Sequence, residues 1–305
     1  MNPEVQKSLT NAVKKLVPLG KIPVIAGATA VGKTSFAISL AQEIQAEIIS
    51  ADSMQFYRGL DIGTAKPAIQ ERRGIPHHLL DSMDIFEKAN IYKFRKCALR
   101  LIEEIRGRGH VPLITGGSGL YIHALIYGLD ELPNDENLRK QLDERYDNPE
   151  HFSELLEIMK KDCPNDADRF AEHRRKLIRA REIFLLTGKE LTSLQQGHNV
   201  PDSQYAQFIL TCDRSALRKR IAQRTAAMLQ MGWIEEAETL LAQGLMNTPT
   251  AWQAIGYATI GEYLRHRITY MEMQEKIEIA TRQYARRQDT WFRNRHKEAV
   301  VFSTL

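Results

Sequence analysis

A phosphate-binding loop (P-loop) with the pattern G-x-x-x-x-G-K-T lies near the start of the chain. Its residues are Gly27, Ala28, Thr29, Ala30, Val31, Gly32, Lys33 and Thr34. The two glycines let the backbone turn so that successive N–H groups face phosphate oxygens, and the following helix adds the positive end of its dipole. Lys33 can reach the terminal phosphates, and the Thr34 hydroxyl can bind Mg²⁺. The pattern therefore predicts a site for a phosphorylated ligand.

A carboxylate and a hydroxyl follow two further strand-like segments. Residues 47–50 end just before Asp52, at the edge of a parallel sheet where ligands bind. There Asp52 can act as a general base or hold Mg²⁺ through water. Residues 111–115 run into a Gly-Gly-Ser-Gly turn instead of the metal-binding Asp of an ATPase, which argues against an ATPase. Ser118 in that turn can contact a substrate, or cap the helix that follows.

Two arginines form another candidate group. Arg220 and Arg224 lie one turn apart on the helix expected after the strand at residues 208–211. This spacing predicts two guanidinium groups aimed at one spot. A solvated surface pair is the alternative.

Strands and helices alternate along residues 22–128, as a parallel α/β sheet requires. Between about Pro133 and Pro201 only helical spacing occurs, one strand then follows, and helices are expected to continue to the end of the chain. The fold class is therefore α/β, a P-loop NTPase-like parallel sheet core with an all-helical insertion domain. The expected parts are 1–20 (N-terminal extension), 21–132 with 202–305 (core) and 133–201 (insertion). The expected strands are 24–26, 47–50, 111–115 and 208–211, with helices from Lys33, over 92–106 and from Leu120.

Composition excludes several classes of protein. The 305 residues are 43% hydrophobic and 26% charged, with no apolar run long enough to span a membrane and no apolar signal segment in residues 1–21. Three cysteines without C-x-x-C spacing argue against a zinc site. We therefore expect a cytoplasmic protein with no membrane partner. The net charge of +4 does not itself show nucleic-acid binding, although basic clusters near residues 174–181 and 282–297 suit a polyanion.

Four long motifs resemble the tRNA dimethylallyltransferase family, bacterial type. Besides the P-loop they are residues 52–67, residues 75–81 (Ile-Pro-His-His-Leu-Leu-Asp) and residues 116–121 (Gly-Gly-Ser-Gly-Leu-Tyr). The resemblance continues through residues 254–257 and 282–288, and covers nearly all of the chain from Ile22 to Arg293. It implies transfer of the dimethylallyl group from dimethylallyl diphosphate to the N6 amine of the adenine next to the anticodon in tRNA, with release of diphosphate.

The resemblance also implies roles for residues. The P-loop would hold the leaving diphosphate, with Arg224 as a clamp and Thr34 placing the Mg²⁺ cofactor. Asp52 would be the general base for the adenine amine. The extruded adenine would lie among Asp52, Ser53, Met54, Gln55 and Ser118, and Gln55 can pair with an adenine edge.

Two further segments correspond to contacts with the tRNA anticodon stem-loop. In the insertion they are Arg139, Arg175, Lys176, Leu177, Ile178 and Arg179. Nearer the C-terminus they are Gln253, Ala254, Ile255, Gly256, Tyr257 and Ala258. Many relatives carry arginine where this chain has Gln253 and Ala258, so contacts from these two positions are not implied with the same force.

Two other enzymes and one binding protein remain as alternatives. A prenyl transferase that uses free adenine nucleotide shares the core motifs, but the basic insertion argues against it. A P-loop small-molecule kinase would use the loop for ATP, but the Asp expected after residues 111–115 is missing. A non-catalytic RNA-binding protein would have no need of Lys33, Thr34 and Asp52 together. We expect the protein to act as a monomer.

Overall fold

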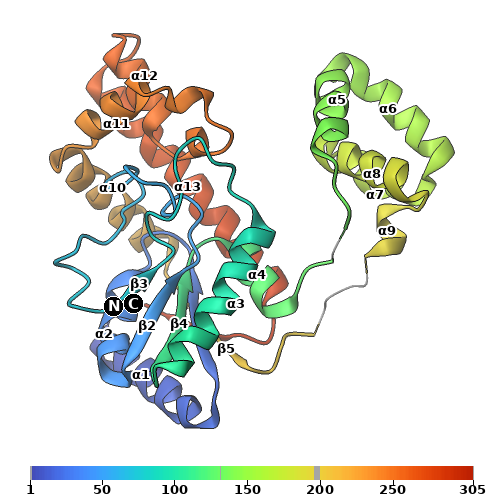
Figure 1. Ribbon diagram of the computed structural model, residues 1–305. Helices are drawn as coiled ribbons and strands as arrows, with labels where there is room; N and C mark the ends of the chain where they lie inside the picture. Colours follow the sequence, from blue (N-terminus) through green and yellow to red (C-terminus); the bar gives the residue numbers. More distant parts are fainter. Residues whose placement is uncertain (1, 131, 196–199, 305) are drawn as a thin grey trace. The chain divides into compact units, whose positions relative to one another are not determined.

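The structure, a computed structural model, describes residues 2–130, 132–195 and 200–304. It divides into two compact units, Met1–Tyr127 with Pro201–Leu305, and Gly128–Val200 (Figure 1). The second unit begins five residues before the predicted insertion. Residues 196–199 of that insertion lie outside the described residues.

The first unit is built on a six-stranded parallel sheet with the order β3-β2-β4-β1-β5-β6. The predicted α/β class with a P-loop NTPase-like core is confirmed. The strands are β1 (Ile22–Gly27), β2 (Ala46–Ser50), β3 (His77–His78), β4 (Val111–Gly116), β5 (Tyr205–Thr211) and β6 (Val300–Ser303).

Alternating strand residues feed two hydrophobic cores, one on each face of the sheet. Val24 and Ala26 of β1 belong to one core, and Ile25 between them belongs to the other. The helices of this unit are α1 (Pro3–Leu16), α2 (Lys33–Ile44), α3 (Ile91–Gly107), α4 (Gly119–Tyr127), α10 (Arg214–Gln230), α11 (Trp233–Ala242), α12 (Tyr257–Leu264) and α13 (Tyr270–Arg295), with short 3₁₀ turns at Val17–Leu19, Leu245–Asn247 and Ala251–Gln253.

Three features of this unit differ from the sequence prediction. Both edge strands were missed, because β3 is two histidines long and β6 is a four-residue strand that follows a 26-residue helix. The expectation that helices continue to the end is therefore wrong. The predicted N-terminal extension is also part of the core, since Leu9 and Val13 of α1 are fully buried with Ile25 and residues of α2.

Among its described residues the second unit contains helices and no strands, and it has its own core. Leu155, Met159, Leu177 and Ile183 are fully buried in it. Prolines open two of its helices, where the missing N–H costs nothing. The helices are α5 (Glu136–Tyr146), α6 (Pro149–Asp162), α7 (Pro164–Phe170), α8 (Arg174–Thr187) and α9 (Leu191–Leu194).

A buried carboxylate closes the amino edge of the sheet. Glu47 of β2 accepts two hydrogen bonds from Arg108, at 2.9 and 2.7 Å, and pairs with His110 at 2.8 Å and His78 at 2.6 Å. The bonds from Arg108, and then those from the two histidines, lower the pKa of Glu47 to about 2 against the opposing effect of burial. This group ties β2 to β3 and to the turn before β4.

We expect Glu47→Gln to lower the free energy of unfolding at pH 7 by roughly 2 kcal/mol. A folded-state pKa below the unfolded value of 4.5 gives stability that is present above pH 4.5 and is lost as the pH falls toward 2. Urea unfolding of both proteins between pH 7 and pH 4 measures this. The difference between them should begin to shrink near pH 4.5, and a difference that grows on acidification would contradict the assignment.

Candidate active site

Three loops meet at the carboxyl edge of the sheet, as the strand order requires. β4 lies between β1 and β2, with Ala26 opposite Gly116 and Ser50 opposite Thr115. The turn after β4 therefore separates the P-loop after β1 from Asp52 after β2. Close packing of these loops depends on glycine, because a Cβ on Gly116 would lie 2.2 Å from the Ala51 carbonyl oxygen.

The P-loop backbone has the concave form that binds anions. Ala30 and Gly32 adopt left-handed φ values of 64° and 97°, a conformation that turns neighbouring N–H groups toward one centre. α2 begins directly after the loop, at Lys33. The Thr34 hydroxyl is exposed in the first turn of that helix, where it is accessible to a bound ion.

Two cations converge on this loop with little negative charge to offset them. The Lys33 ammonium donates to the Ala28 carbonyl at 2.7 Å, and Arg224 of α10 donates to the Thr29 hydroxyl at 3.2 Å. Burial lowers the pKa of Lys33 to about 8, Asp52 opposes this effect, and Arg224 adds to it. Burial likewise lowers the pKa of Arg224. The arrangement favours a bound anion, which would supply the missing charge.

The predicted arginine pair does not form. Arg224 points to the P-loop, but Arg220 donates to the hydroxyl of Thr304 at 3.0 Å and to its carbonyl oxygen at 3.3 Å. Arg220 therefore fastens the segment after β6 to α10, and Arg224 alone contacts the P-loop. One helical turn aligns two side chains on a face, but their partners decide where each guanidinium lies.

Asp52 lies in the loop after β2, and Ser118 lies in the turn after β4. Asp52 accepts a hydrogen bond from the Met54 N–H at 3.1 Å, which fixes the carboxylate next to its own backbone. The Ser118 N–H donates to the Ala51 carbonyl at 3.1 Å. The Ser118 carbonyl, not its hydroxyl, begins α4 by accepting from Ile122 at 3.1 Å. Within the described residues the hydroxyl has no hydrogen bond, so it is available to a substrate.

One side chain that links these loops was missed by the sequence analysis. Gln288 of α13, 5% exposed, accepts from the Thr29 N–H at 2.8 Å and donates to the Gly117 carbonyl at 2.9 Å. The pKa of Tyr284, one turn earlier on α13, is raised mainly by burial and then by the charge of Asp52. The motif at residues 282–288 contained both residues, but no spacing rule connects a distant helix to a P-loop.

The segment expected to hold an adenine is only partly available. Ser53 and Met54 are partly exposed. The amide of Gln55 is engaged by the protein, because it donates to the Thr64 and Ala65 carbonyls at 3.2 and 3.3 Å and accepts from Ser50 at 3.3 Å. In this structure Gln55 holds the loop together and has no free edge for base pairing.

A partly buried carboxylate holds the far end of the same segment. Glu236 of α11 accepts from the N–H groups of Asp61, Ile62 and Gly63, at 3.1, 2.7 and 3.0 Å. It also accepts from the Tyr257 hydroxyl at 2.7 Å. Motifs almost 200 residues apart in the sequence therefore share one hydrogen-bonded cluster.

This cluster limits which side chains of the predicted tRNA-binding segment at residues 253–258 are accessible. Tyr257 is fully buried and Ala254 is 5% exposed, while Gly256 packs so closely on Trp233 that a Cβ would lie 2.2 Å from its ring. Their side chains cannot reach a ligand on the surface. Gln253 and Ala258 are exposed, and Ile255 is partly exposed; contacts from these three positions stay a prediction.

The predicted basic surface of the helical unit is likewise smaller than expected. Leu177 and Ile178 lie in its core, so burial excludes their side chains from tRNA. Arg139 and Arg179 both pair with Glu182, which is fully buried, Arg179 Nη1 lying 2.7 Å from the carboxylate. In the described part of the chain, Arg175 and Lys176 are exposed and have no ion-pair partner. These two cations remain candidates for contact with phosphates.

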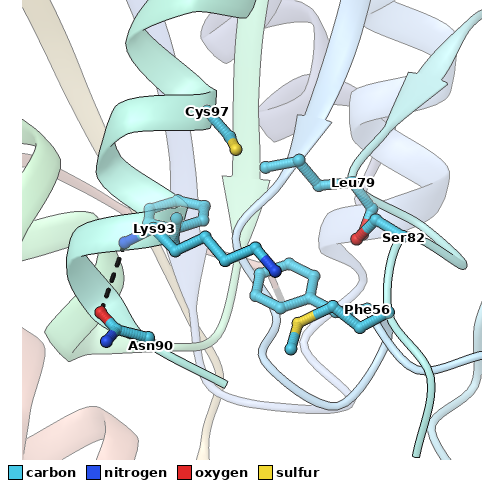
Figure 2. Close-up of a pocket in the computed structure, with 8 residues that line it drawn as sticks. Phe56, Leu79, Ser82, Asn90, Lys93 and Cys97 are labelled. Carbon is cyan, nitrogen blue, oxygen red and sulfur yellow. Dashed lines mark hydrogen bonds between the residues drawn. The ribbon is translucent and has the colours of Figure 1, made fainter. Parts of the chain in front are cut away.

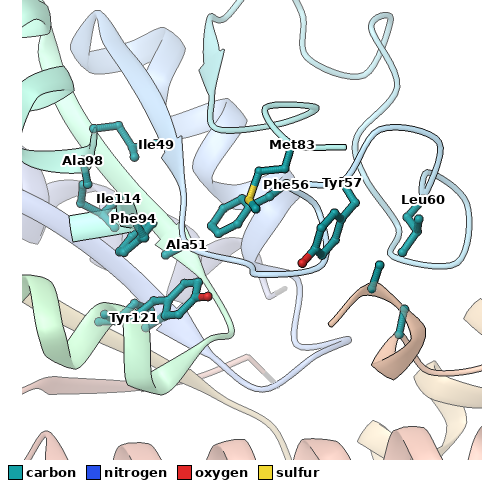
Figure 3. Packing of buried hydrophobic residues seen from close by; sticks show 14 of the residues in the cluster. Ile49, Ala51, Phe56, Tyr57, Leu60, Met83, Phe94, Ala98, Ile114 and Tyr121 are labelled. Carbon is teal, nitrogen blue, oxygen red and sulfur yellow. The ribbon is translucent and has the colours of Figure 1, made fainter. Parts of the chain in front are cut away.

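Stacked aromatic rings pack the loop after β2 against α3 and α4. Phe56, Phe94 and Tyr121 stack with ring centroids 4.8 to 5.8 Å apart (Figure 3). A small cavity of about 80 Å³ opens beside this stack, between α3 and the segment before it (Figure 2). It is lined by Phe56, Leu79, Ser82, Met83, Asn90, Lys93, Phe94 and Cys97. Ligand pockets typically measure about 300 Å³ or more, so this cavity is too small for a nucleoside.

A preformed metal cage was not found. No group of three or more His, Cys, Asp or Glu side chains suited to a metal ion occurs among the described residues. The oxygen donors at the site, Thr34 and Asp52, suit Mg²⁺, which often takes one or two protein ligands together with phosphate oxygens. Within the same residues, none of the helices is long and apolar enough to cross a membrane.

The lowered pKa of Lys33 predicts how anion binding depends on pH. A pKa of about 8 means that the ammonium loses its proton as the pH rises through 8. We expect the affinity for inorganic diphosphate with Mg²⁺, measured by calorimetry, to fall about tenfold between pH 7 and pH 9.5. Lys33→Arg, whose charge does not titrate in this range, should show no such decline. A flat profile in the unmodified protein would contradict a role for the Lys33 charge.

Comparison with known proteins gives one consistent family. The family described as IPP transferase matches residues 55–295. The chain is 40% identical to a tRNA dimethylallyltransferase of Kocuria rhizophila over 278 residues, covering 89% of this chain and 87% of the relative. It is 39% identical to a tRNA dimethylallyltransferase of Thermotoga petrophila over 290 residues, covering 93% and 92%.

Solved structures agree with the sequence comparisons. The crystal structure of a full-length tRNA isopentenylpyrophosphate transferase from Bacillus halodurans has a TM-score of 0.68 and 36% identity, covering 93% of this chain and 90% of that one. A eukaryotic dimethylallyltransferase acting on tRNA has a TM-score of 0.79 and 29% identity, covering 93% and 74%.

Proposed function

This chain belongs to the IPP transferase family, and from that premise we propose that it moves a dimethylallyl group from dimethylallyl diphosphate to tRNA. The acceptor is the N6 amine of the adenine next to the anticodon, and the second product is diphosphate. The observation that carries the proposal is the pairing of an anion-binding P-loop with Asp52 across one strand. Relatives named tRNA dimethylallyltransferase match over about nine-tenths of the chain.

The P-loop holds the leaving group in this reaction. The bond between the allylic C1 carbon and its oxygen breaks, and the electron pair stays on the diphosphate. Lys33, Arg224 and the loop N–H groups lie where that charge develops, and preorganised donors in a partly buried site stabilise such charge strongly. The P-loop thus grips a diphosphate without hydrolysing a nucleotide.

Asp52 acts on the acceptor. The adenine amine is a weak nucleophile because its lone pair is delocalised into the ring, so a carboxylate that takes its proton as the C–N bond forms lowers the barrier. Extrusion of the adenine from the anticodon loop brings the amine to the site. The residues near Asp52 that remain available to contact the adenine are Ser118, Ser53 and Met54.

Mg²⁺ is the implied cofactor. The Thr34 hydroxyl would hold it together with diphosphate oxygens, and Asp52 through water. Bound there, the ion neutralises charge on the leaving diphosphate. The absence of a protein cage among the described residues agrees with an ion that arrives with its substrate.

tRNA phosphates are the partners that we assign to the exposed cations of α8. We expect Arg175→Ala combined with Lys176→Ala to weaken tRNA binding about tenfold and to reduce the slope of log affinity against log salt by one to two. Filter binding at several salt concentrations measures both quantities. Arg179→Ala is the contrasting variant, because loss of a partner of buried Glu182 should lower Tm. Unchanged affinity and slope in the double variant would remove α8 from the tRNA surface.

One experiment separates this function from its alternatives. The protein is incubated with Mg²⁺ and labelled dimethylallyl diphosphate, and in parallel with tRNA or AMP; labelled ATP with candidate acceptors tests for a kinase. Label in tRNA supports the proposal. Label that enters AMP and never tRNA would support the free-nucleotide enzyme, and transfer from ATP alone would support a kinase.

A further inference from the structure

The side-chain amide of Gln288 joins the P-loop to the turn after β4. Gln288 Oε1 accepts from Thr29 in the P-loop at 2.8 Å, and Nε2 donates to the Gly117 carbonyl at 2.9 Å. The next residue, Ser118, donates to Ala51 at 3.1 Å, directly before Asp52. Three hydrogen bonds, together with the peptide bonds from Gly117 to Ser118 and from Ala51 to Asp52, therefore connect the P-loop to the residue that takes the proton.

The packing around this amide shows a site built for it. Gln288 is 5% exposed, and both ends of its amide are satisfied. A Cβ on Gly117 would lie 2.3 Å from Gln288 Nε2, so the turn after β4 accepts the amide only with glycine at this position. The polar end of Gln288 is thus held in one orientation, with the carbonyl toward the P-loop and the amino group toward the turn.

We propose that Gln288 is a positioning residue, which fixes the distance between the diphosphate leaving group and the base that serves the acceptor. This role rests on the proposed function. A substitution reaction at carbon requires the nucleophile and the leaving group to lie in line, and a misplacement of 1 Å can cost about 10²-fold in rate. Gln288 couples the two loops that set this geometry, although it contacts neither reacting atom.

Two substitutions separate positioning from folding. Gln288→Ala removes both hydrogen bonds. Gln288→Glu keeps an acceptor for the Thr29 N–H but places a carboxylate oxygen against the Gly117 carbonyl, so that it breaks the link while preserving the size of the side chain. Gln283→Ala is the matched control, because Gln283 is exposed on the same helix and has no hydrogen bond among the described residues.

The measurements are the single-turnover rate of label transfer to tRNA at saturating substrates, the affinities for tRNA and for inorganic diphosphate with Mg²⁺, and Tm. We expect both Gln288 variants to lose about 10- to 100-fold in rate. In Gln288→Ala both affinities should stay within about threefold of the unmodified protein, whereas the carboxylate of Gln288→Glu would lie beside the P-loop and should also weaken diphosphate binding. Gln283→Ala should match the unmodified protein in every measurement.

Three results would overturn the proposal. Full rate in Gln288→Ala shows that the link is not needed, and full activity in Gln288→Glu alone shows that only the bond to Thr29 matters. A rate loss accompanied by equal losses in both affinities and a large fall in Tm would assign Gln288 to folding. Failure of the unmodified protein to label tRNA would instead defeat the proposed function itself, so the two failures are distinguishable.

Discussion

Asp52→Asn is expected to lower kcat for transfer to tRNA by about 10²- to 10⁴-fold. The asparagine amide has almost the shape of the carboxylate and still offers an oxygen to the Met54 N–H, which Asp52 accepts at 3.1 Å. It cannot take a proton from the adenine amine. The substitution therefore removes the base and leaves the loop in place.

Affinities distinguish this loss from a disturbed site. We expect tRNA affinity, measured by filter binding, to stay within about threefold of the unmodified protein, and Tm to stay unchanged. Asp52→Glu retains a carboxylate at a different reach and should recover part of the rate, because proton transfer requires hydrogen-bond distance. If turnover in Asp52→Asn stays within about threefold of normal, a group other than Asp52 acts as the general base.

Arg224→Ala is expected to lower kcat/KM for dimethylallyl diphosphate by about 10²- to 10³-fold. Arg224 is the guanidinium that contacts the P-loop, through Thr29 at 3.2 Å. The positive charge of Arg224 stabilises the diphosphate most strongly as the C–O bond breaks. Removing it should therefore lower kcat as well as raise KM. Steady-state kinetics with varied dimethylallyl diphosphate at saturating tRNA measures both terms.

Arg220→Ala is the matched control for this prediction. It removes the same side chain one turn earlier on α10, where the guanidinium binds Thr304 and does not reach the P-loop. We expect its kcat/KM to stay within about threefold of normal, with a lower Tm because the segment after β6 is released. Arg224→Ala should have an unchanged or higher Tm, since it relieves a desolvated cation. Equal kinetic losses in the two variants would remove the special role of Arg224.

The parts of the fold that follow from local pattern could be predicted from sequence. The strands β1, β2, β4 and β5 are short apolar runs buried on both faces, and the P-loop is set by its own glycines. The position of Asp52 followed from strand order alone, because carboxyl ends of parallel strands share one edge. The IPP transferase family was recognised because several motifs occur in a fixed order.

The remaining features depend on contacts between residues distant in the sequence. Gln288 meets Thr29 across 259 residues, and Glu236 meets the N–H groups at residues 61–63 across more than 170 residues. Tyr257 and Gln55 looked like polar residues in functional motifs, yet they hold the protein's own loops. Arg179 was expected on a basic surface, but it neutralises Glu182, a charge that helical spacing could not locate. In each case the partner decided the role.

The strand order also determines when the active site can assemble during synthesis. β1 carries the P-loop and pairs with β5 over six residues, from Ile22 opposite Tyr205 to Gly27 opposite Leu210. A nascent chain must therefore hold β1 without one of its neighbours while nearly 180 further residues are translated. The helical unit is contiguous in sequence, so it can fold as it leaves the ribosome. The link through Gln288 can form only after residue 288 has been translated, so we expect the complete active site to form late in synthesis.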